Sequence, residues 1–363
     1  MCTEFEAKPT ELKNFSTALG YLADDVPNAT AYCNSWVRKA SDRDGIFANF
    51  CATATQVADR LNEDLERIRT ILSLSSTEIS KLADYYLYTD KTTAENLDRT
   101  YTDYQRTPTY TPQPGTGPLP DDPSAAIWGE PNSDNPIPVL GDIVLHAAGV
   151  LLSPTEIVLT IISWFCDGKN PLDESLKWVA GDWNAANQGS DALVKLAKFH
   201  GAMAVEINKA QLAVMLSWQG HSADAANSYF NRLVDAVDDL VPALNRISPE
   251  FHTVAYGMWS SAKALASLLS TISDLLIAAA ISWAATGAVS WTGVGGLIGL
   301  LISSAETAAL VKTVLKAYDV WNGMIACVDA FAGICAGYLG GLHSIDTINA
   351  VGTVSSPYDS PFV

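Results

Sequence analysis

Apolar residues recur at helical spacing along most of the chain. Residues 10–26 place them three and four positions apart, and residues 46–97 extend the same pattern over more than ten turns. The longer stripe consists of Val57, Leu61, Leu65, Ile68, Leu72, Ile79, Leu82 and Tyr86. Such spacing is typical of amphipathic α-helices. It predicts a rod-like helical hairpin, with Pro27 ending or kinking the first helix.

Charged residues occupy the side of the second helix opposite this stripe. They are Arg60, Glu63, Asp64, Glu66 and Arg67, and we expect all of them to face solvent.

The second half of the chain repeats the helical pattern. Residues 139–166 predict two short helices, and residues 173–216 and 221–245 predict two amphipathic helices joined by a tight turn. We find no strand-rich region. The sequence therefore predicts an all-α fold, an elongated bundle of two long helical hairpins.

Nine prolines in residues 107–138 mark an extended linker between the halves. Residues 262–345 are strongly apolar, and residues 275–305 carry no charge. Glycines near 286–296 divide this region into helices 262–284 and 294–316, which predicts a C-terminal apolar helical hairpin. Two interpretations stay open: a packed soluble hairpin, or a membrane-competent or oligomer-forming element. The predicted units are 1–106, 107–138, 139–260, 261–350 and a flexible tail, 351–363.

Composition narrows the class of function. The net charge of −18 disfavours nucleic acid as a partner, because phosphate contacts need clustered lysine and arginine. The sequence shows no catalytic, phosphate-binding or metal-binding motif, so we expect neither an enzyme nor a cofactor or metal. The N-terminus lacks the apolar core of a Sec signal peptide. Cys33 and Cys51 flank a predicted turn and are candidates for a disulfide if the protein leaves the cytoplasm.

The turn between the two later helices reads Ser217-Trp218-Gln219-Gly220-His221-Ser222. Gly220 supplies backbone freedom, and Ser222 is expected to cap the following helix. Trp218 is expected to project from the tip as a docking group. In this setting the segment from Asp182 to Leu240 resembles the WXG family of type VII secretion substrates.

A second motif lies at the end of the long helix. Tyr86 and Asp90 fit the pattern Tyr-x-x-x-Asp, whose two side chains share a helix face. The run from Leu82 to Asp98 resembles the end of the EspC-like secreted family, in which this pattern is a secretion tag. In related PE and PPE partner pairs, the Trp-x-Gly tip lies beside the Tyr-x-x-x-Asp motif. The resemblance therefore implies a composite secretion signal of Trp218, Gly220, Tyr86 and Asp90, with Trp218 within roughly 20 Å of Tyr86.

These resemblances cover about half of the chain, residues 10–100 and 180–260. They imply an actinobacterial type VII (ESX) substrate, secreted or displayed at the cell surface. It would be an export and scaffold module similar to the N-terminal regions of secreted toxins and channel–toxin fusions. The implied partners are the type VII secretion ATPase, a secretion chaperone and small WXG-family proteins. The alternative is a pore- or channel-forming secreted protein that contacts membranes through residues 262–345.

Overall fold

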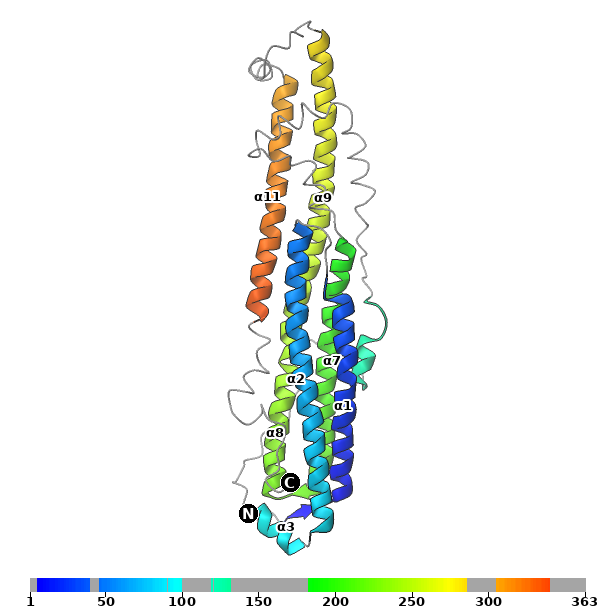
Figure 1. The fold of residues 1–363 in the computed structure, drawn as a ribbon. Helices are drawn as coiled ribbons and strands as arrows, with labels where there is room; N and C mark the ends of the chain where they lie inside the picture. Colours follow the sequence, from blue (N-terminus) through cyan, green and yellow to red (C-terminus); the bar gives the residue numbers. More distant parts are fainter. Residues whose placement is uncertain are drawn as a thin grey trace.

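The computed structural model describes residues 5–39, 46–89, 91–99, 119, 121–131, 182–285 and 305–339. Within these residues the fold is essentially all-α, as predicted, and the helices form an elongated rod (Figure 1). The elements in chain order are β1 (Glu6–Ala7), α1 (Pro9–Trp36), α2 (Ile46–Tyr88), α3 (Lys91–Asp98), the 3-10 helix η1 (Pro123–Ile127), α7 (Trp183–Met215), β2 (Trp218–Gln219), α8 (His221–Asp238), α9 (Leu240–Ala285) and α11 (Ala305–Leu339).

Helices α1 and α2 form the first hairpin. The apolar stripe predicted for α2 is buried up to Leu82, and Tyr86 is half-buried. The Ser16 hydroxyl donates to the Ser76 carbonyl at 2.8 Å, and Lys13 pairs with Asp84 at 2.7 Å. These contacts between distant parts of the sequence hold the two helices antiparallel.

Of the two outcomes expected at Pro27, an end or a kink of the first helix, the end is wrong, because α1 continues to Trp36. Proline removes one backbone hydrogen bond from a helix. Beyond Pro27 the apolar face continues with Ala29, Tyr32 and Cys33, all buried. We infer that burial of this extra length outweighs the lost bond.

Two further expectations for α2 need correction. The helix ends at Tyr88, and α3 is a separate helix, so residues 46–97 are not one continuous rod. Asp64 does not face solvent: it is buried and pairs with the Arg60 guanidinium at 3.1 Å. Helix α2 contacts α1, α11 and, through Ser75 and the Tyr229 hydroxyl, α8. More than one side of α2 is therefore covered.

The second hairpin consists of α7 returning through α8 and α9. The Asp182 carboxylate caps α7 by accepting from the Ala185 amide at 2.9 Å. The apolar residues that recur at helical spacing in α7 and α8 are buried. Residues 139–181, including Trp178 at the start of the predicted helix 173–216, lie outside the described residues. Phe15 of α1 packs edge-on against Phe230 of α8, with ring centroids 4.8 Å apart. The two hairpins thus share one core.

An aromatic cluster joins four helices near the middle of the rod. Phe50 of α2 contacts Trp183 of α7, Phe251 of α9 and Phe331 of α11, with ring centroids 5.8, 5.5 and 5.1 Å away. Phe47 packs edge-on against Trp183 at 4.8 Å. This cluster anchors the C-terminal helix to the bundle.

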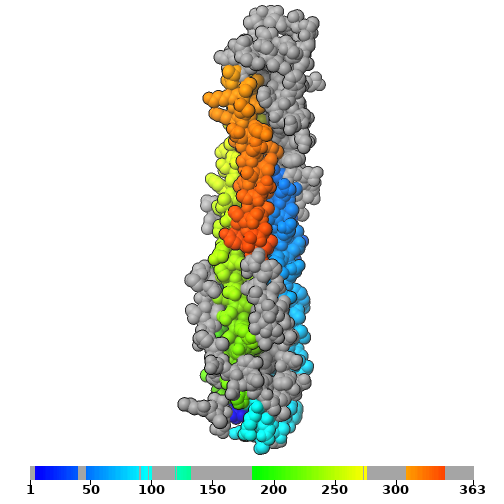
Figure 2. All heavy atoms as spheres, turned by 90° about the vertical axis from the view of Figure 1, so that its left-hand side faces the viewer, coloured from blue at the N-terminus to red at the C-terminus, as the bar shows by residue number. Residues whose placement is uncertain are grey.

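The C-terminal hairpin is present with different limits from those predicted. Helix α9 runs unbroken from Leu240, so its first arm does not begin at 262. In the second arm α11 continues to Leu339, past the predicted end at 316, and residues 294–304 lie outside the described residues. The first arm is longer because α9 packs on α7 before it reaches α11. The glycine-rich turn lies outside the described residues. Figure 2 shows α11 lying along one flank, between α9 and α2.

Part of the predicted linker is packed on the bundle. Helix η1 lies against α1 and α7, and the Ser124 hydroxyl donates to the Asp25 carboxylate at 2.9 Å. The Lys195 ammonium donates to the carbonyls that follow η1, those of Trp128, Gly129 and Glu130, at 3.0, 3.3 and 3.0 Å. A cation at the end of a helical turn stabilises these free carbonyls. Residues 121–131 are therefore an ordered strap across the two hairpins.

The predicted disulfide between Cys33 and Cys51 is not formed, since both are buried free cysteines. The Cys33 thiol instead donates to the Ala58 carbonyl at 3.9 Å. Cys51 precedes Ala58 by seven residues. That spacing puts Cys51 about 10 Å further along α2. Flanking the same turn does not place two residues opposite each other.

His200 predicts a specific dependence of stability on pH. It is 0% exposed in α7, neither ring nitrogen has a hydrogen-bond partner among the described residues, and burial lowers its pKa to about 4. Between pH 6.5 and pH 4, His200 is therefore protonated in the unfolded chain but neutral in the folded chain. Stability attributable to neutral His200 is complete above pH 6.5. It falls as the pH approaches 4, by about 3 kcal/mol.

The measurement is urea unfolding of the wild type and a His200→Leu variant at pH 7 and pH 4. We expect the wild type to lose about 3 kcal/mol more than the variant between the two values. An equal loss in both proteins would contradict the assignment.

Candidate functional site

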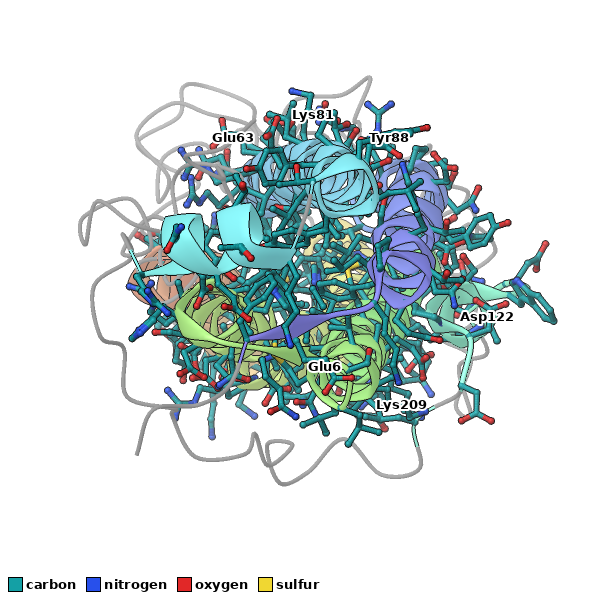
Figure 3. All side chains as sticks on the ribbon, turned by 90° about the horizontal axis from the view of Figure 1, so that it is seen from below. Glu6, Glu63, Lys81, Tyr88, Asp122 and Lys209 are labelled. Atoms are coloured by element: carbon teal, nitrogen blue, oxygen red, sulfur yellow. The ribbon has the colours of Figure 1, made fainter. Side chains whose placement is uncertain are left out.

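Four segments of the chain meet at one end of the rod. They are β1, the end of α2 with α3 directly after it in the sequence, and the turn between α7 and α8, so three distant stretches of the chain supply them (Figure 1). Strand β1 pairs antiparallel with β2, with Ala7 opposite Trp218 and Glu6 opposite Gln219. The Lys8 amide extends this pairing by donating to the Ser217 carbonyl at 3.2 Å. Viewed from below in Figure 3, β1 and α3 lie across the end of the bundle.

Trp218 and Tyr86 are linked through one hydroxyl. The Trp218 indole Nε1 donates to Ser222 Oγ at 3.3 Å, and the Tyr86 hydroxyl lies 3.1 Å from the same oxygen. The Phe5 ring packs edge-on against Tyr86, with centroids 5.4 Å apart. The fold therefore brings Trp218 and Tyr86 together, as the two motifs together predicted.

The expectation that Trp218 projects into solvent is wrong, because its side chain is 0% exposed. A tip exposed in an isolated hairpin is covered here by other parts of the chain: β1 pairs with its backbone, and Tyr86 meets it through Ser222. The exposed side chains next to Tyr86 and Trp218 in the sequence include Leu87, Tyr88 and Leu216.

The cap of α8 also differs from the prediction. Ser222 does not cap its own helix; the buried Asp98 carboxylate of α3 accepts from the His221 and Ser222 amides, at 2.8 and 2.9 Å. A carboxylate at a helix N-terminus satisfies free amides and interacts favourably with the helix dipole. Asp98 thus fixes α3 to the start of α8.

Gly220 is the residue that permits this arrangement. Its φ of +122° is a conformation that residues with a side chain rarely adopt, and a Cβ there would lie 2.5 Å from an Asp98 carboxylate oxygen. The prediction that the turn needs glycine holds, and the close approach of Asp98 is a second reason for it.

Sequence reasoning missed Asp98 and the pairing of β1 with β2. Asp98 is the last residue of the run that suggested the EspC-like resemblance, but nothing in that run ties it to residues more than 120 positions later. Asp90 lies outside the described residues, so the structure places Tyr86 but not its predicted partner.

The described part of the chain holds no cluster of three or more His, Cys, Asp or Glu side chains that could bind a metal ion. The polar groups at the tip are engaged with one another: indole with hydroxyl, hydroxyl with hydroxyl, and carboxylate with two amides. These hydrogen bonds join the two halves of the chain at this end of the rod.

Comparison of the chain with known protein families, with curated proteins and with solved structures found no match.

Proposed function

We propose that this chain is a type VII secretion substrate, an export and scaffold module whose signal is the composite tip of its helical bundle. The observation that carries the proposal is the hydrogen-bonded chain from Trp218 through Ser222 to Tyr86. The resemblance to WXG and EspC-like substrates implies that these two motifs act together. Here they belong to one polypeptide and are linked through the Ser222 hydroxyl.

The composite tip offers a simple physical basis for recognising a folded cargo. Tyr86 ends the first hairpin and Trp218 lies in the turn of the second, so the signal assembles only when the hairpins pack together. An unfolded chain would carry both motifs without their geometry. We propose that the secretion ATPase, with a dedicated chaperone, recognises this assembled tip and exports the protein.

Conservative variants test the signal. Tyr86→Phe removes the hydroxyl that meets Ser222, and Trp218→Phe removes the indole donor, while both keep an aromatic ring. In a type VII-competent host, we expect each variant to reach the culture supernatant at least about tenfold less than wild type. That factor corresponds to about 1.4 kcal/mol of lost recognition.

Matched controls use aromatic residues away from the tip. Tyr21 on α1 and Trp128 after η1 are both 69% exposed, and Tyr21→Phe and Trp128→Phe should leave export unchanged. Thermal unfolding by circular dichroism checks that all four variants fold. Undiminished export of folded Tyr86→Phe and Trp218→Phe would refute the proposed signal.

One observation favours a second candidate function, membrane contact or pore formation by the C-terminal helices. Ala308–Leu339 of α11 is long and apolar enough to cross a bilayer, and only 22% of its most apolar window is buried. A core helix of the same composition would be mostly covered. Val311, Leu315 and Ile334 are among its exposed apolar residues.

Dye release from liposomes distinguishes the two candidates. A pore-forming chain releases dye from neutral liposomes, and Leu315→Glu with Ile334→Glu should abolish release because charge on this face opposes insertion. A chain that only carries the export signal leaves the liposomes intact. Its tip variants would then affect secretion alone.

A further inference from the structure

The turn that carries Trp218 is held by two short segments that come from outside its own hairpin. We call β1 and α3 together the clasp. On one side, β1 pairs with β2 and Lys8 bonds to Ser217. On the other, Asp98 of α3 holds the first two amides of α8. The residues from Ser217 to Ser222 are therefore hydrogen-bonded to β1 at one end and to α3 at the other.

The clasp is short and buries few apolar side chains compared with the helices beside it. Strand β1 has two residues, and α3 has eight. Among the α3 side chains that the structure describes, only Ala94 and Asp98 are buried. Helix α2, by contrast, buries an apolar stripe along nearly its full length. Segments with few buried apolar contacts open locally at a lower free energy than the core.

We propose that the clasp opens as a unit while the bundle stays folded, and that this opening exposes the Trp218 ring to a binding partner. The two halves are coupled because both contact the same short loop. When Asp98 leaves the His221 and Ser222 amides, Gly220 and the neighbouring β2 become more mobile, and the pairing of β2 with β1 weakens. The closed clasp is then an autoinhibitory contact over the aromatic group. Opening is a property of the free chain, and only its role in partner recognition rests on the proposed export function.

Hydrogen exchange of the purified chain tests the coupling. Three sets of protons report on it: the amides of 5–8, the amides of 217–224, and the Trp218 indole N–H, observed by NMR after 15N-tryptophan labelling. The chain has ten tryptophans, so the Trp218 signal is assigned by its loss in Trp218→Phe. Amides of 57–72 in α2 serve as the reference for global unfolding.

Asp98→Asn removes the negative charge that strengthens the hydrogen bonds from the His221 and Ser222 amides, so α3 is held less firmly to α8. We expect exchange of all three reporters to rise together by about tenfold, with the α2 reference unchanged. Phe5 directly precedes β1 and packs against Tyr86, so Phe5→Ala loosens the β1 half of the clasp. If the halves are coupled, this variant also speeds exchange at His221 and Ser222.

The control is Glu95→Gln on the same helix, where the carboxylate pairs with Lys91 at 3.7 Å near the surface. It should leave every reporter unchanged. Faster exchange confined to His221 and Ser222 in Asp98→Asn would overturn the proposal, since it would show a local cap without a coupled clasp. An equal rise in the α2 reference would overturn it too, because opening would then be global. Neither result depends on the export assays.

Discussion

Replacing Phe50 with alanine is expected to lower the free energy of unfolding by about 3–5 kcal/mol, the usual cost of deleting a large buried aromatic side chain. Phe50 is 0% exposed and touches rings from α7, α9 and α11. The cavity would lie where four helices meet, so no single neighbour can fill it. Urea unfolding followed by circular dichroism measures the loss.

Tyr21→Ala is the matched control for this prediction. Tyr21 lies on the solvent side of α1 and is 69% exposed. Its removal should change stability by no more than about 0.5 kcal/mol. A Phe50→Ala variant as stable as Tyr21→Ala would show that the four helices do not converge on this cluster.

Gly220→Ala is expected to destabilise the tip by about 3 kcal/mol, although it adds a single methyl group. Two costs combine. The φ of +122° is strained for alanine, and the new Cβ would meet the Asp98 carboxylate at 2.5 Å. The carboxylate must then withdraw from the His221 and Ser222 amides. Stability is measured by urea unfolding, and displacement of Asp98 by amide exchange at His221 and Ser222.

Gly129 separates these two costs. It also has a positive φ, +72°, but a Cβ there would meet nothing within 4 Å. Gly129→Ala should therefore cost only backbone strain, about 1 kcal/mol. In the double variant Asp98→Ala with Gly220→Ala, the clash is gone, so the combined loss should be smaller than the sum of the single losses. Strict additivity would contradict the contact.

Much of the fold follows from local pattern. The stripes of α2, α7 and α8 fix which faces are buried, because apolar residues three and four apart can reach a core only from a helix. The same reasoning placed Gly220 in the turn. The expected proximity of Tyr86 and Trp218 came instead from the arrangement of two motifs in related proteins. Periodicity alone could not have paired them.

The misplaced features depend on contacts between distant residues. Asp64 is polar, yet α2 is covered on more than one side and the Arg60 pair makes its burial tolerable. Trp218 sits at a turn, where exposure is the usual expectation, and only β1 and Tyr86 explain its burial. Pro27 weakens a helix locally, while burial of the residues after it decides the outcome. Each case is a tertiary contact overriding a local preference.

The most direct test of the export proposal compares secretion of the unmodified chain from two host strains. One strain has an intact type VII secretion ATPase, and the other carries an inactivating substitution in its nucleotide site. Our account predicts that the chain accumulates in the supernatant of the first strain and stays in the cell pellet of the second, at equal expression. Equal amounts in both supernatants, with a cytoplasmic marker confirming intact cells, would contradict it.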